Sequence, residues 1–520
     1  MAISDEWRTN AFIRRASRGY NQSMKRKNPL QIATWLLVTT CLVSLTGCGT
    51  DDPGSGEEGP QPPDVVLFLV DTLRWDWTQP GGFDRETTPN LSKLAQQSVV
   101  FEQASSAAPW TLPSVVSLFT GKHLAEHNVV HDRLRMAAST VTFPQLLQEW
   151  GYQTASFHRN PYAGGKWGIK RGFDQTTLTS GQTDRTLLAE FFSNLTAMPF
   201  LLYVHNTEPH DPHVVRKKFM GTFDEVPSGF LKEYGELVEV YRQSTREDYV
   251  KKNELGTIDN TEIQQKWIDR LDLRTEEIRN LYSVSVRDAD DHLGDVIAGL
   301  KEQGRWKNTL FIMVADHGEE LGDHGGWQHD QSAYQELIHV PLIVRFPGDE
   351  YAGKRIPTPV SLVDVMPTIL EAVKCPLERP AMSGISLMPL IRGDADPSGE
   401  MRLVSIRNNK KKYFKPYKEG RGDLNVVVRK GFLKAIFNIE PNTLELFDLA
   451  ADPGETQDLA QELGPEAAAL KLFAARTYAE MLKRSDQAQA GNLDDQSADV
   501  LQALKDLGYV GEDSESEDPR

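Results

Sequence analysis

Three stretches of the chain consist almost entirely of apolar residues, and each of them leads into a polar residue. The stretches span residues 65–70, 200–204 and 309–314. They are followed by Asp71, by His205 and, one residue further on, by Asp316. Unbroken apolar runs of this length are typical of buried parallel strands. Since ligands of open α/β sheets gather where such strands end, we expect these polar residues to meet at one edge of a sheet.

Helical periodicity fills much of the sequence between these predicted strands. Apolar residues recur at helical spacing in the stretches 88–97, 113–120, 143–150 and 288–303. An alternation of strands and helices is typical of a mostly parallel sheet with helices on its faces. We therefore predict an α/β fold with a mostly parallel central sheet, in a domain that spans residues 64–400.

The stretch 211–281 departs from this alternation because it is more polar than its surroundings. Its part at 241–255 is charged and only weakly periodic. We interpret the stretch as an insertion over the site at the sheet edge, where it could act as a lid.

The pattern changes again beyond about residue 401. Short alternating runs at 403–407, 425–429 and 433–439 predict a small antiparallel sheet. Residues 500–504 predict a closing helix, and an acidic tail follows at 511–520. We expect a C-terminal α+β subdomain at 401–510.

The N-terminal residues are typical of a targeting segment. A basic group at 25–27 precedes an apolar run at 32–45 and the motif Leu-Thr-Gly-Cys at 45–48. This order is that of a signal peptide, and the run is shorter than the roughly 20 residues that span a membrane. The motif resembles the bacterial lipobox, whose cysteine receives lipid. The alternative is a plain secretory signal with a coincidental cysteine.

The lipobox resemblance implies that residues 1–47 are removed and that Cys48 carries a lipid anchor. Residues 48–63 are rich in acidic residues, glycine and proline and would form a flexible tether. Translation could begin at Met1 or at Met24. We therefore expect an exported protein of the cell envelope, anchored to a membrane through Cys48.

Composition narrows the possible functions. With 520 residues and 39% hydrophobic content, the chain is typical of a folded globular protein. Its formal net charge of −17 argues against a nucleic-acid partner, because binding to phosphate backbones depends on Lys and Arg. Two of the three cysteines lie in the predicted signal segment, so no disulfide framework is expected.

Candidate metal ligands follow two of the predicted strands. Asp71, Asp316 and His317 provide two carboxylates and an imidazole, a set that suits a divalent metal ion. The alternative is structural: an aspartate that caps the next helix and an Asp-His pair in a turn.

A candidate nucleophile precedes a predicted helix. Pro113 and Ser114 would lie in its first turn, and the free N–H groups of a helix N-terminus can bind an anion. Thr111 would lie just outside that end. The alternative for this threonine is a simple helix cap.

Several motifs resemble those of sulfatases and their relatives in the alkaline phosphatase superfamily, and they occur in the same order. They are Asp-Thr-Leu-Arg at 71–74, Trp-Thr-Leu-Pro-Ser at 110–114, Pro-His-Asp-Pro at 209–212, Ala-Asp-His-Gly-Glu-Glu at 315–320 and Glu-Leu-Phe-Asp-Leu at 445–449. The similarity covers roughly residues 64–460. It implies an alkaline-phosphatase-like or sulfatase-like fold.

The resemblance also implies roles for single residues. Asp71, Asp316 and His317 would bind the metal, and Thr111 would both ligate it and attack the substrate. His210 matches the histidine of the Pro-His-x-Pro motif, which would protonate the leaving group or contact the ester oxygen.

Four further residues are expected near the substrate. His329 matches a segment that places a histidine there, and it is our second choice for an anion contact. Lys122, Asn160 and Lys166 are weaker candidates for substrate binding. For both His210 and His329 the alternative is an ordinary polar surface position.

The chain departs from the sulfatase pattern at several positions. Sulfatases carry Cys or Ser at the position of Thr111 and oxidise it to formylglycine, whereas oxidation of threonine would give a ketone. We therefore expect no formylglycine. Thr72 replaces a second aspartate, Val115 replaces an arginine, and Gly168 replaces the histidine of a Gly-Lys-Trp-His segment.

These expectations favour a metal-dependent hydrolase of small or glycan-borne sulfate or phosphate esters. Metal coordination would make the Thr111 hydroxyl a usable nucleophile. The missing formylglycine favours phosphate esters, whereas the family resemblance alone favours sulfate esters. The alternatives are a phosphodiesterase or phospho-headgroup transferase of the same superfamily, and a non-catalytic surface binding protein.

The metal itself is only partly specified by the sequence. We predict one divalent ion, which could be Ca²⁺, Mn²⁺, Mg²⁺ or Zn²⁺. Asp211 and His213 could contribute to a second metal site.

Overall fold

The computed structural model describes most of the chain from residue 61 onwards. The described residues are 61–165, 167–179, 183–213, 216–244, 260–395, 397–408, 423–486, 489–490 and 502. Several predicted features lie outside this part: the signal peptide, Cys48, most of the tether, Lys166, the acidic tail and, apart from Gln502, the closing helix. Among the residues described, none of the helices has both the length and the apolar character to cross a membrane.

A sheet of eight strands forms the centre of the described part, in the order β12-β2-β11-β8-β1-β7-β5-β6. The strands are β1 (Asp64–Val70), β2 (Val99–Phe101), β5 (Gln153–His158), β6 (Gln175–Leu178), β7 (Phe200–Asn206), β8 (Thr309–Ala315), β11 (Leu342–Arg345) and β12 (Arg355–Ile356). Strand β11 runs antiparallel to both of its neighbours, and the other neighbouring strands are parallel. The predicted mostly parallel sheet is confirmed.

The three predicted apolar strands are the three central ones, and every residue in them is buried. Apolar side chains on both faces suit strands that are covered by helices on both sides. In the register of the sheet, Val70 of β1 pairs with Asn206 of β7 and with Ala315 of β8. The three strands therefore end level with one another, which brings the residues at their carboxyl ends to one edge.

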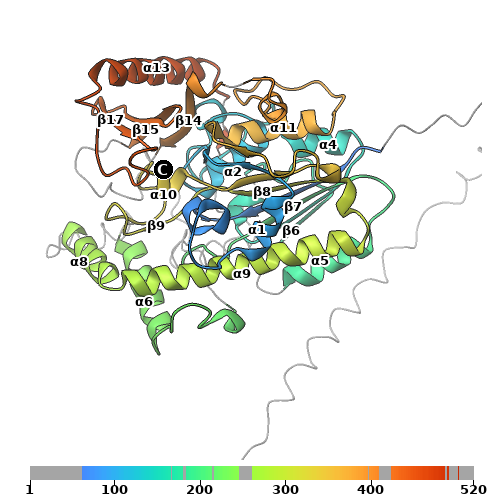
Figure 1. Ribbon diagram of the computed structural model, residues 1–520, viewed down its shortest axis with the longest axis horizontal. Helices are drawn as coiled ribbons and strands as arrows, with labels where there is room; N and C mark the ends of the chain where they lie inside the picture. Colours follow the sequence, from blue (N-terminus) through green and yellow to red (C-terminus); the bar gives the residue numbers. More distant parts are fainter. Residues whose placement is uncertain are drawn as a thin grey trace, which may run out of the picture. The chain divides into compact units, whose positions relative to one another are not determined.

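Helices cover both faces of this sheet (Figure 1). On one face lie α1 (Pro89–Gln96), α5 (Thr183–Ser193) and α9 (Thr275–Glu302), and on the other lie α2 (Thr111–Thr120), α4 (Phe143–Glu149) and α11 (Val365–Ala372). The helices predicted at 88–97, 113–120 and 143–150 are confirmed within a few residues. Helix α9 begins well before the predicted start at residue 288, because its first half is also buried, for instance at Ile278 and Leu281.

The polar insertion is largely helical where it is described. Helices α6 (Phe230–Ser244) and α8 (Asn260–Asp272) pack against each other and lead into α9. Its role as a lid stays a prediction.

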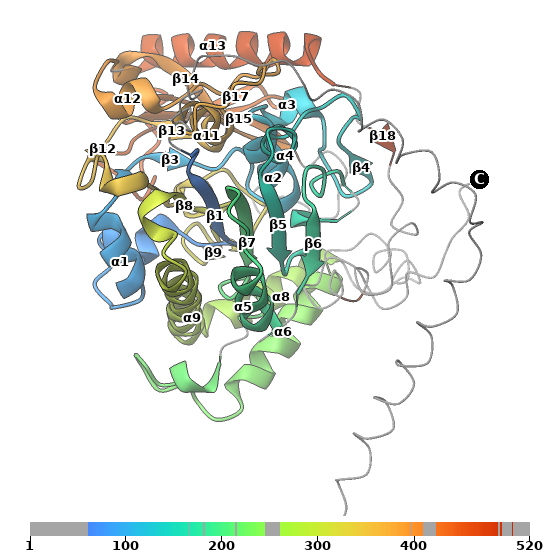
Figure 2. The same cartoon turned by 90° about the vertical axis from the view of Figure 1, so that its right-hand side faces the viewer.

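A second sheet contains the four antiparallel strands β14 (Met401–Asn408), β15 (Leu424–Lys430), β16 (Leu433–Asn438) and β17 (Thr443–Asp448). Figure 2 shows α13 (Gly464–Lys483) lying across this sheet. Ile406, Val426 and Phe437 pack with α13 residues such as Leu470 on that side. The antiparallel sheet predicted from the alternating runs is confirmed, whereas α13 has no counterpart in the sequence prediction.

The other face of the four-stranded sheet packs on α10 (Gln335–Ile338), which lies between β8 and β11 in the chain. Its apolar residues Val427, Ile436 and Phe447 contact Leu337 and Ile338. The same face also buries three cationic side chains, each at most 1% exposed: Arg407, Arg429 and Lys434. Buried cations are costly unless they are paired, so this contact between the two sheets is unusually polar.

Short elements complete the described structure. They are α3 (Leu124–His127), α10 (Gln335–Ile338), α12 (Met388–Arg392), β3 (Ala104–Ser105), β4 (Leu134–Arg135), β9 (Glu320–Leu321), β10 (Trp327–Gln328), β13 (Val360–Ser361) and β18 (Gln489–Ala490).

Candidate active site

Two carboxylates and two imidazoles meet at the ends of the central strands. Asp71 follows β1, His205 is near the end of β7, and Asp316 and His317 follow β8. We call these four residues the strand-end cluster; each is at most 1% exposed. Potential ligand atoms of Asp71, His205 and Asp316 lie within 4.8 Å of one another. His317 Nε2 lies 3.4 Å from Asp71 Oδ1 and 3.7 Å from Asp316 Oδ2.

Hydrogen bonds orient both imidazoles. His317 Nδ1 lies 2.8 Å from the carbonyl oxygen of Gly318, so Nδ1 carries the proton and the Nε2 lone pair faces the carboxylates. Burial, followed by the nearby His329, lowers the pKa of His317 to about 3, which keeps this ring neutral. His205 Nδ1 contacts the Tyr203 hydroxyl at 2.9 Å, and its Nε2 contacts Asp71 Oδ2 at 3.1 Å.

The two carboxylates influence each other's ionisation. Burial and the neighbouring Asp71 raise the pKa of Asp316 well above its usual range. Burial also opposes ionisation of Asp71, but the hydrogen bond from His205 and the charges of nearby histidines hold its pKa below the usual value. Two like charges this close favour the binding of a positive ion between them.

The donor atoms of this cluster fit a divalent metal ion. Asp71 Oδ1 and Asp316 Oδ2 are buried and have no hydrogen-bond partner within the part of the chain that the structure describes. Buried polar atoms without partners are rare and call for a ligand or an ion. Together with the Nε2 atom of His317 they provide the mixed oxygen and nitrogen set that Mn²⁺ and Zn²⁺ accept.

Thr111 lies at the same cluster, at the first turn of α2. The helix begins at Thr111, with Trp110 as its extended N-cap, so the predicted position just outside the helix is off by one residue. Thr111 Oγ1 is 3.3 Å from His317 Nε2 and accepts a hydrogen bond from Asn160 Nδ2 at 3.1 Å. The same Asn160 amide lies 2.8 Å from Asp71 Oδ2.

Two serines fasten α2 to strand β8. The hydroxyl of Ser114 donates to the carbonyl oxygen of Asp316 at 2.7 Å, and the hydroxyl of Ser106 donates to the same oxygen. The position of Thr111 relative to the strand-end cluster is therefore fixed by hydrogen bonds that are themselves fully buried.

The two predicted substrate histidines also lie beside the cluster. The ring centroids of His210 and His329 are 5.1 Å apart, and those of His317 and His329 are 4.7 Å apart. His210 Nδ1 lies 2.6 Å from the carbonyl oxygen of Asp211. His329 Nδ1 lies 3.1 Å from Glu319 Oε1, and this contact orients the ring.

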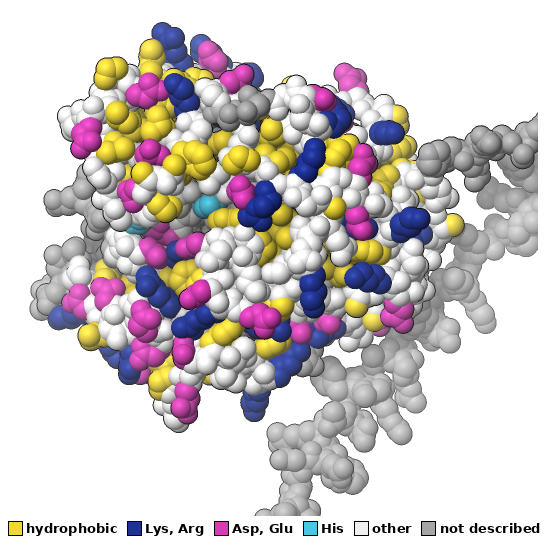
Figure 3. Space-filling model, viewed as in Figure 1, with side chains coloured by type: hydrophobic (Ala, Val, Ile, Leu, Met, Phe, Trp, Pro, Cys, Tyr) yellow, Lys and Arg dark blue, Asp and Glu magenta, His cyan; other side chains and the backbone are white. Residues whose placement is uncertain are grey.

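One face of the molecule has a recess. Figure 3 shows histidine side chains within a recess on one face, with acidic and basic side chains near its edge. A pocket with about 250 Å³ of empty space lies between the β9 and β10 strands and the insertion helices. Its lining residues are Asp211, His213, Tyr234, Val238, Leu271, Glu319, Glu320, Leu321, Trp327 and Gln328.

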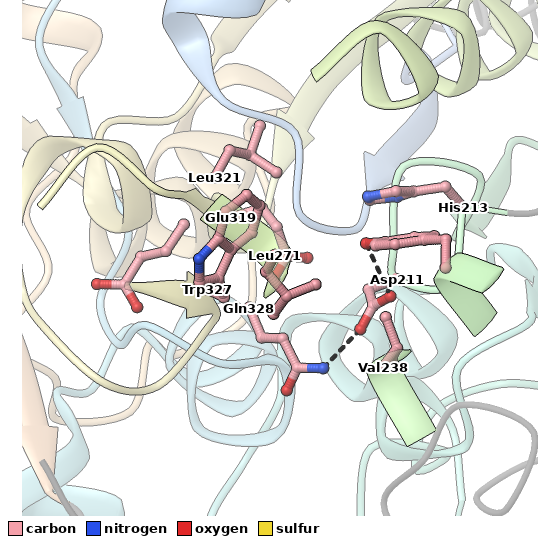
Figure 4. Close-up of a pocket in the computed structure, with 10 residues that line it drawn as sticks. Asp211, His213, Val238, Leu271, Glu319, Leu321, Trp327 and Gln328 are labelled. Atoms are coloured by element: carbon pink, nitrogen blue, oxygen red, sulfur yellow. Dashed lines mark hydrogen bonds between the residues drawn. The ribbon is translucent and has the colours of Figure 1, made fainter. Parts of the chain in front are cut away.

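The lining of this pocket is acidic and aromatic. Figure 4 shows the Asp211 carboxylate accepting a hydrogen bond from Gln328, at 2.7 Å, and another from the neighbouring Tyr234 hydroxyl, at 3.2 Å. Asp211 follows His210 directly, and Gln328 directly precedes His329. The pocket therefore directly adjoins the two segments that carry His210 and His329.

Four of the ten described non-glycine residues with a positive φ value lie around the same place. The non-glycine residues Thr72, His213, Gln328 and Asp330 have φ values of 58°, 37°, 71° and 68°. Each adjoins or belongs to a segment of the candidate site. Left-handed conformations at non-glycine residues are uncommon, and they cluster where function fixes a particular geometry.

Some predicted site residues are not brought to the cluster. Lys122 follows the C-terminal end of α2, opposite to Thr111, and forms an ion pair with Asp486 at 2.7 Å. Lys166 lies outside the described residues. A second metal site at Asp211 and His213 stays a prediction, as do the individual roles of the other predicted site residues.

Sequence reasoning placed His205 at a strand end but did not include it among the metal ligands. Its signal was the same as that of Asp71, a polar residue that follows an apolar run. Glu319 was quoted only as part of a motif, and nothing in the sequence indicated its contact with His329.

Comparisons with protein-family models cover most of the described chain. The sulfatase family model matches residues 63–375, and a model of the C-terminal part of N-sulphoglucosamine sulphohydrolase matches residues 322–473. The first match alone spans more than half of the chain.

Similar proteins of known function include two bacterial sulfatases. An N-acetylglucosamine-6-O-sulfatase of Bacteroides thetaiotaomicron is 23% identical over 84% of this chain and 88% of the relative. A choline-sulfatase of Rhizobium meliloti is 23% identical over 77% of this chain and 82% of the relative.

Solved structures share the fold. The phosphonate monoester hydrolase of Agrobacterium radiobacter has a TM-score of 0.58 and 19% identity, over 81% of this chain and 96% of its own. A protein in complex with its substrate D-glucosamine-2-N,6-O-disulfate has a TM-score of 0.58 and 20% identity, over 82% and 98%. The predicted fold class is confirmed.

Proposed function

Because the chain belongs to the sulfatase family, we propose that it hydrolyses sulfate or phosphate esters at the strand-end cluster, with Thr111 as the nucleophile. One observation carries the proposal. The Thr111 hydroxyl oxygen lies at the helix N-terminus, 3.3 Å from His317 Nε2 and 3.1 Å from Asn160 Nδ2, where it can reach an ester held at the cluster.

The cluster would hold one divalent ion. Asp71, Asp316 and His317 are the proposed ligands, with His205 and Thr111 close enough to contribute. When bound, such an ion makes an alcohol more acidic and neutralises charge on the oxygens of the ester. Which ion the protein uses follows from the loading experiment below.

The first step proposed is attack by Thr111 on the sulfur or phosphorus atom. Thr111 first loses its hydroxyl proton to solvent. A bond then forms between Thr111 Oγ1 and that atom while the bond to the leaving oxygen breaks, and the leaving oxygen takes a proton from His210. The amide of Asn160 donates to Thr111 Oγ1 and stabilises negative charge on this oxygen. His329, held beside Glu319 by the contact of its Nδ1 atom, contacts the anionic oxygens of the substrate.

The second step releases the product. A water molecule gives a proton to His210 and attacks the same sulfur or phosphorus atom, which breaks its bond to Thr111 Oγ1. A sulfated formylglycine hydrate can instead collapse by elimination at carbon, a route that is closed to threonine. Release must therefore occur at sulfur or phosphorus, and this favours phosphate esters.

The proposed substrates are small or glycan-borne esters. Two relatives are named as sulfatases of N-acetylglucosamine-6-O-sulfate and choline, and a structurally similar protein as a phosphonate monoester hydrolase. These names place a sulfate ester and a phosphonate ester among the classes to be tested. The proposed location is the cell envelope, with a lipid anchor at Cys48 that rests on the sequence motif at 45–48 alone.

The test compares ester classes in the purified protein loaded with Ca²⁺, Mn²⁺, Mg²⁺ or Zn²⁺ in turn. The substrates are an aryl sulfate, an aryl phosphate, a bis-aryl phosphate and an aryl phosphonate. We expect turnover of at least one of them, and we expect Thr111→Ala to reduce kcat by at least about 10³-fold, because the attacking oxygen is removed.

Thr111→Ser is the matched control for this experiment. It keeps the hydroxyl and removes only a methyl group, so kcat should stay within about tenfold of the wild-type value. Full activity of Thr111→Ala would exclude Thr111 as the nucleophile. A protein that binds metal but turns over none of the four esters would favour the non-catalytic binding function.

A further inference from the structure

Asp330 joins the segment of His329 to two other parts of the chain. It directly follows His329, and its backbone N–H donates to the carbonyl oxygen of Pro109 at 3.0 Å. Its own carbonyl oxygen accepts a hydrogen bond from Arg407 Nε at 2.8 Å. Since Pro109 precedes Thr111 by only two positions, one backbone unit contacts both the histidine segment and the loop that leads to the nucleophile.

Arg407 reaches this backbone unit from the four-stranded sheet. It lies on β14 with no exposed surface, and its second hydrogen bond runs from Nη1 to Asn425 Oδ1 on β15, at 3.0 Å. Asn425 in turn donates from Nδ2 to Asn438 Oδ1 on β16 at 2.5 Å. These residues are register partners, so their side chains lie in one row across the sheet.

The row continues to the last strand and returns to the same segment. Asn438 Nδ2 donates to Glu445 Oε1 on β17 at 3.2 Å, and Glu445 Oε2 accepts a hydrogen bond from the Tyr334 hydroxyl at 2.6 Å. The four residues Arg407, Asn425, Asn438 and Glu445 form what we call the polar row. The polar row forms hydrogen bonds with Asp330 and with Tyr334. It therefore holds both ends of the segment 330–334, which follows His329.

A polar row with three buried members is a costly way to join two parts of the molecule. Apolar residues of similar size would avoid the desolvation cost of the buried Arg407 guanidinium and of the buried Asn425 and Asn438 amides, whereas Glu445 is only partly buried. The segment it holds is also strained, because the residues on both sides of His329, Gln328 and Asp330, have left-handed backbones. Such conformations persist only where the surroundings over-determine them.

We infer that Arg407 is a positioning residue, which fixes His329 and, through Asp330 and Pro109, the loop before Thr111. The catalytic meaning of this inference rests on the proposed function, whereas the mechanical coupling does not. An arginine suits the task because its planar group directs two donors in fixed directions, one to the Asp330 carbonyl oxygen and one to Asn425.

The coupling can be measured without activity, by hydrogen exchange of the full-length protein. In Arg407→Gln we expect amides in residues 326–332 and 105–112 to exchange at least about tenfold faster, because the Asp330 carbonyl loses its donor. Amides of strand β1 should exchange at the wild-type rate. Wild-type exchange in both segments would overturn the inference.

Arg429→Gln is the matched control. Arg429 is as deeply buried on the same face of the same sheet, but it donates to Gln103 and to the carbonyl oxygen of Gly431. Exchange in the two segments should stay within about twofold of wild type. If Arg429→Gln accelerates it as much as Arg407→Gln, loss of any buried arginine suffices, and the inference is wrong.

Kinetics then connect the coupling to catalysis. Arg407→Gln should lower kcat about 10- to 100-fold with little change in KM, since a displacement of about 1 Å near reacting groups has this effect. In a His329→Gln background the same substitution should have a clearly smaller effect, because one of the two groups that it positions is already lost. Additive effects in this cycle would overturn the positioning role.

The positioning role of Arg407 can be tested separately from the proposed ester hydrolysis. If Arg407→Gln fails to fold, Arg407→Lys replaces it; a single flexible ammonium cannot hold both acceptors, so the same accelerated exchange is expected. If the wild-type protein turns over no ester, the proposed function fails, and the exchange measurements still decide whether Arg407 fixes the two segments.

Discussion

A single methyl group distinguishes Thr111 from the serine that many sulfatases carry at this position. The methyl lies on the carbon that oxidation would convert to an aldehyde in serine, so that threonine can give only a ketone. The hydroxyl oxygen keeps its contacts with His317 and Asn160. At the residue scale, the chain therefore retains a hydroxyl oxygen at this position, whereas it cannot form the aldehyde hydrate.

A second prediction for a single residue concerns the contribution of His205 to metal binding. Its Nε2 atom lies 3.1 Å from Asp71 Oδ2, either as a direct ligand or as the group that orients one. We expect His205→Ala to weaken the binding of Mn²⁺ or Zn²⁺ about 10- to 100-fold, the range usual for residues that support metal ligands. Competition with a chromophoric chelator measures this affinity.

Tyr203→Phe is the control for this measurement. It leaves the imidazole in place and removes only the hydroxyl that contacts His205 Nδ1 at 2.9 Å, so a smaller loss of affinity is expected. Unchanged affinity in His205→Ala would restrict the ligands to Asp71, Thr111, Asp316 and His317.

Single residues were predictable from the sequence where a strand end or a motif marked them. Asp71, Asp316 and His317 meet as expected, because parallel strands that end level bring their following residues together. Arg407 could not be found in this way. It lies within a strand, and only the packing of one sheet on another shows what it contacts.

At the scale of elements, the turn between β9 and β10 is fastened by one histidine. His324 Nδ1 lies 2.6 Å from Glu336 Oε1, its Nε2 lies 3.3 Å from the carbonyl oxygen of Glu455, and its ring stacks on Tyr334. The strands on either side of this turn contribute Glu320, Leu321, Trp327 and Gln328 to the pocket beside the cluster.

This histidine makes stability depend on pH. Partial burial lowers the pKa of His324, but the hydrogen bond and charge of Glu336, followed by Glu455, raise it overall above the ordinary value. A raised pKa means that the folded state binds the proton more tightly than the unfolded chain does. The stabilisation is therefore complete below about pH 6.5, the usual histidine value, and is lost as the pH rises through the pKa of the folded state.

Urea unfolding between pH 5 and 9 tests the prediction. The difference in the free energy of unfolding between the wild type and His324→Gln should be largest at pH 5 and should decrease steadily toward pH 9. A difference that is independent of pH would show that His324 acts through packing on Tyr334 and not through its charge.

The elements themselves were predictable to different degrees. The central strands were found because they are apolar on both faces, a pattern with few alternative interpretations. The start of α9 was predicted too late, since the insertion helices bury residues that the periodicity alone does not group together. Helix α13 was missed; its many alanines and its few buried residues, such as Leu470 and Ala474, make a weak pattern.

At the scale of the whole molecule, the contact between the two sheets contains a fully buried ion pair. Lys434 Nζ lies 2.6 Å from Glu455 Oε1, and neither side chain has exposed surface. We expect Glu455→Gln to lower the free energy of unfolding by about 3–5 kcal/mol, because the ammonium is left without a counter-charge in a dry environment. Chemical denaturation followed by far-UV circular dichroism measures this loss.

The double variant Lys434→Met/Glu455→Leu tests the cause. It removes both charges and keeps similar volume, so its stability should lie closer to the wild-type value than that of Glu455→Gln. If the double variant is less stable than the single one, the pair contributes to stability itself, and the desolvation argument fails for this interface.

The sequence predicted the two sheets of the molecule, but it did not predict which side chains connect them. Apolar runs, helical periodicity and the family motifs together gave the mostly parallel sheet and the smaller antiparallel one. Which polar side chains of the small sheet contact the segment after His329 depends on register and twist, as for Asn425 and Asn438. These are properties of the assembled sheet, and no local pattern encodes them.

The strand-end cluster comes from the central strands, whereas the proposed attacking oxygen belongs to the first residue of α2. Because these groups belong to different elements, a mutation can change one of them without the other. Each of the six serine codons becomes a threonine codon by a single base change, and such a change at position 111 leaves every strand-end residue in place. A single mutation can therefore remove the residue that is oxidised in sulfatases and leave the strand-end cluster, with its proposed metal ligands, unchanged.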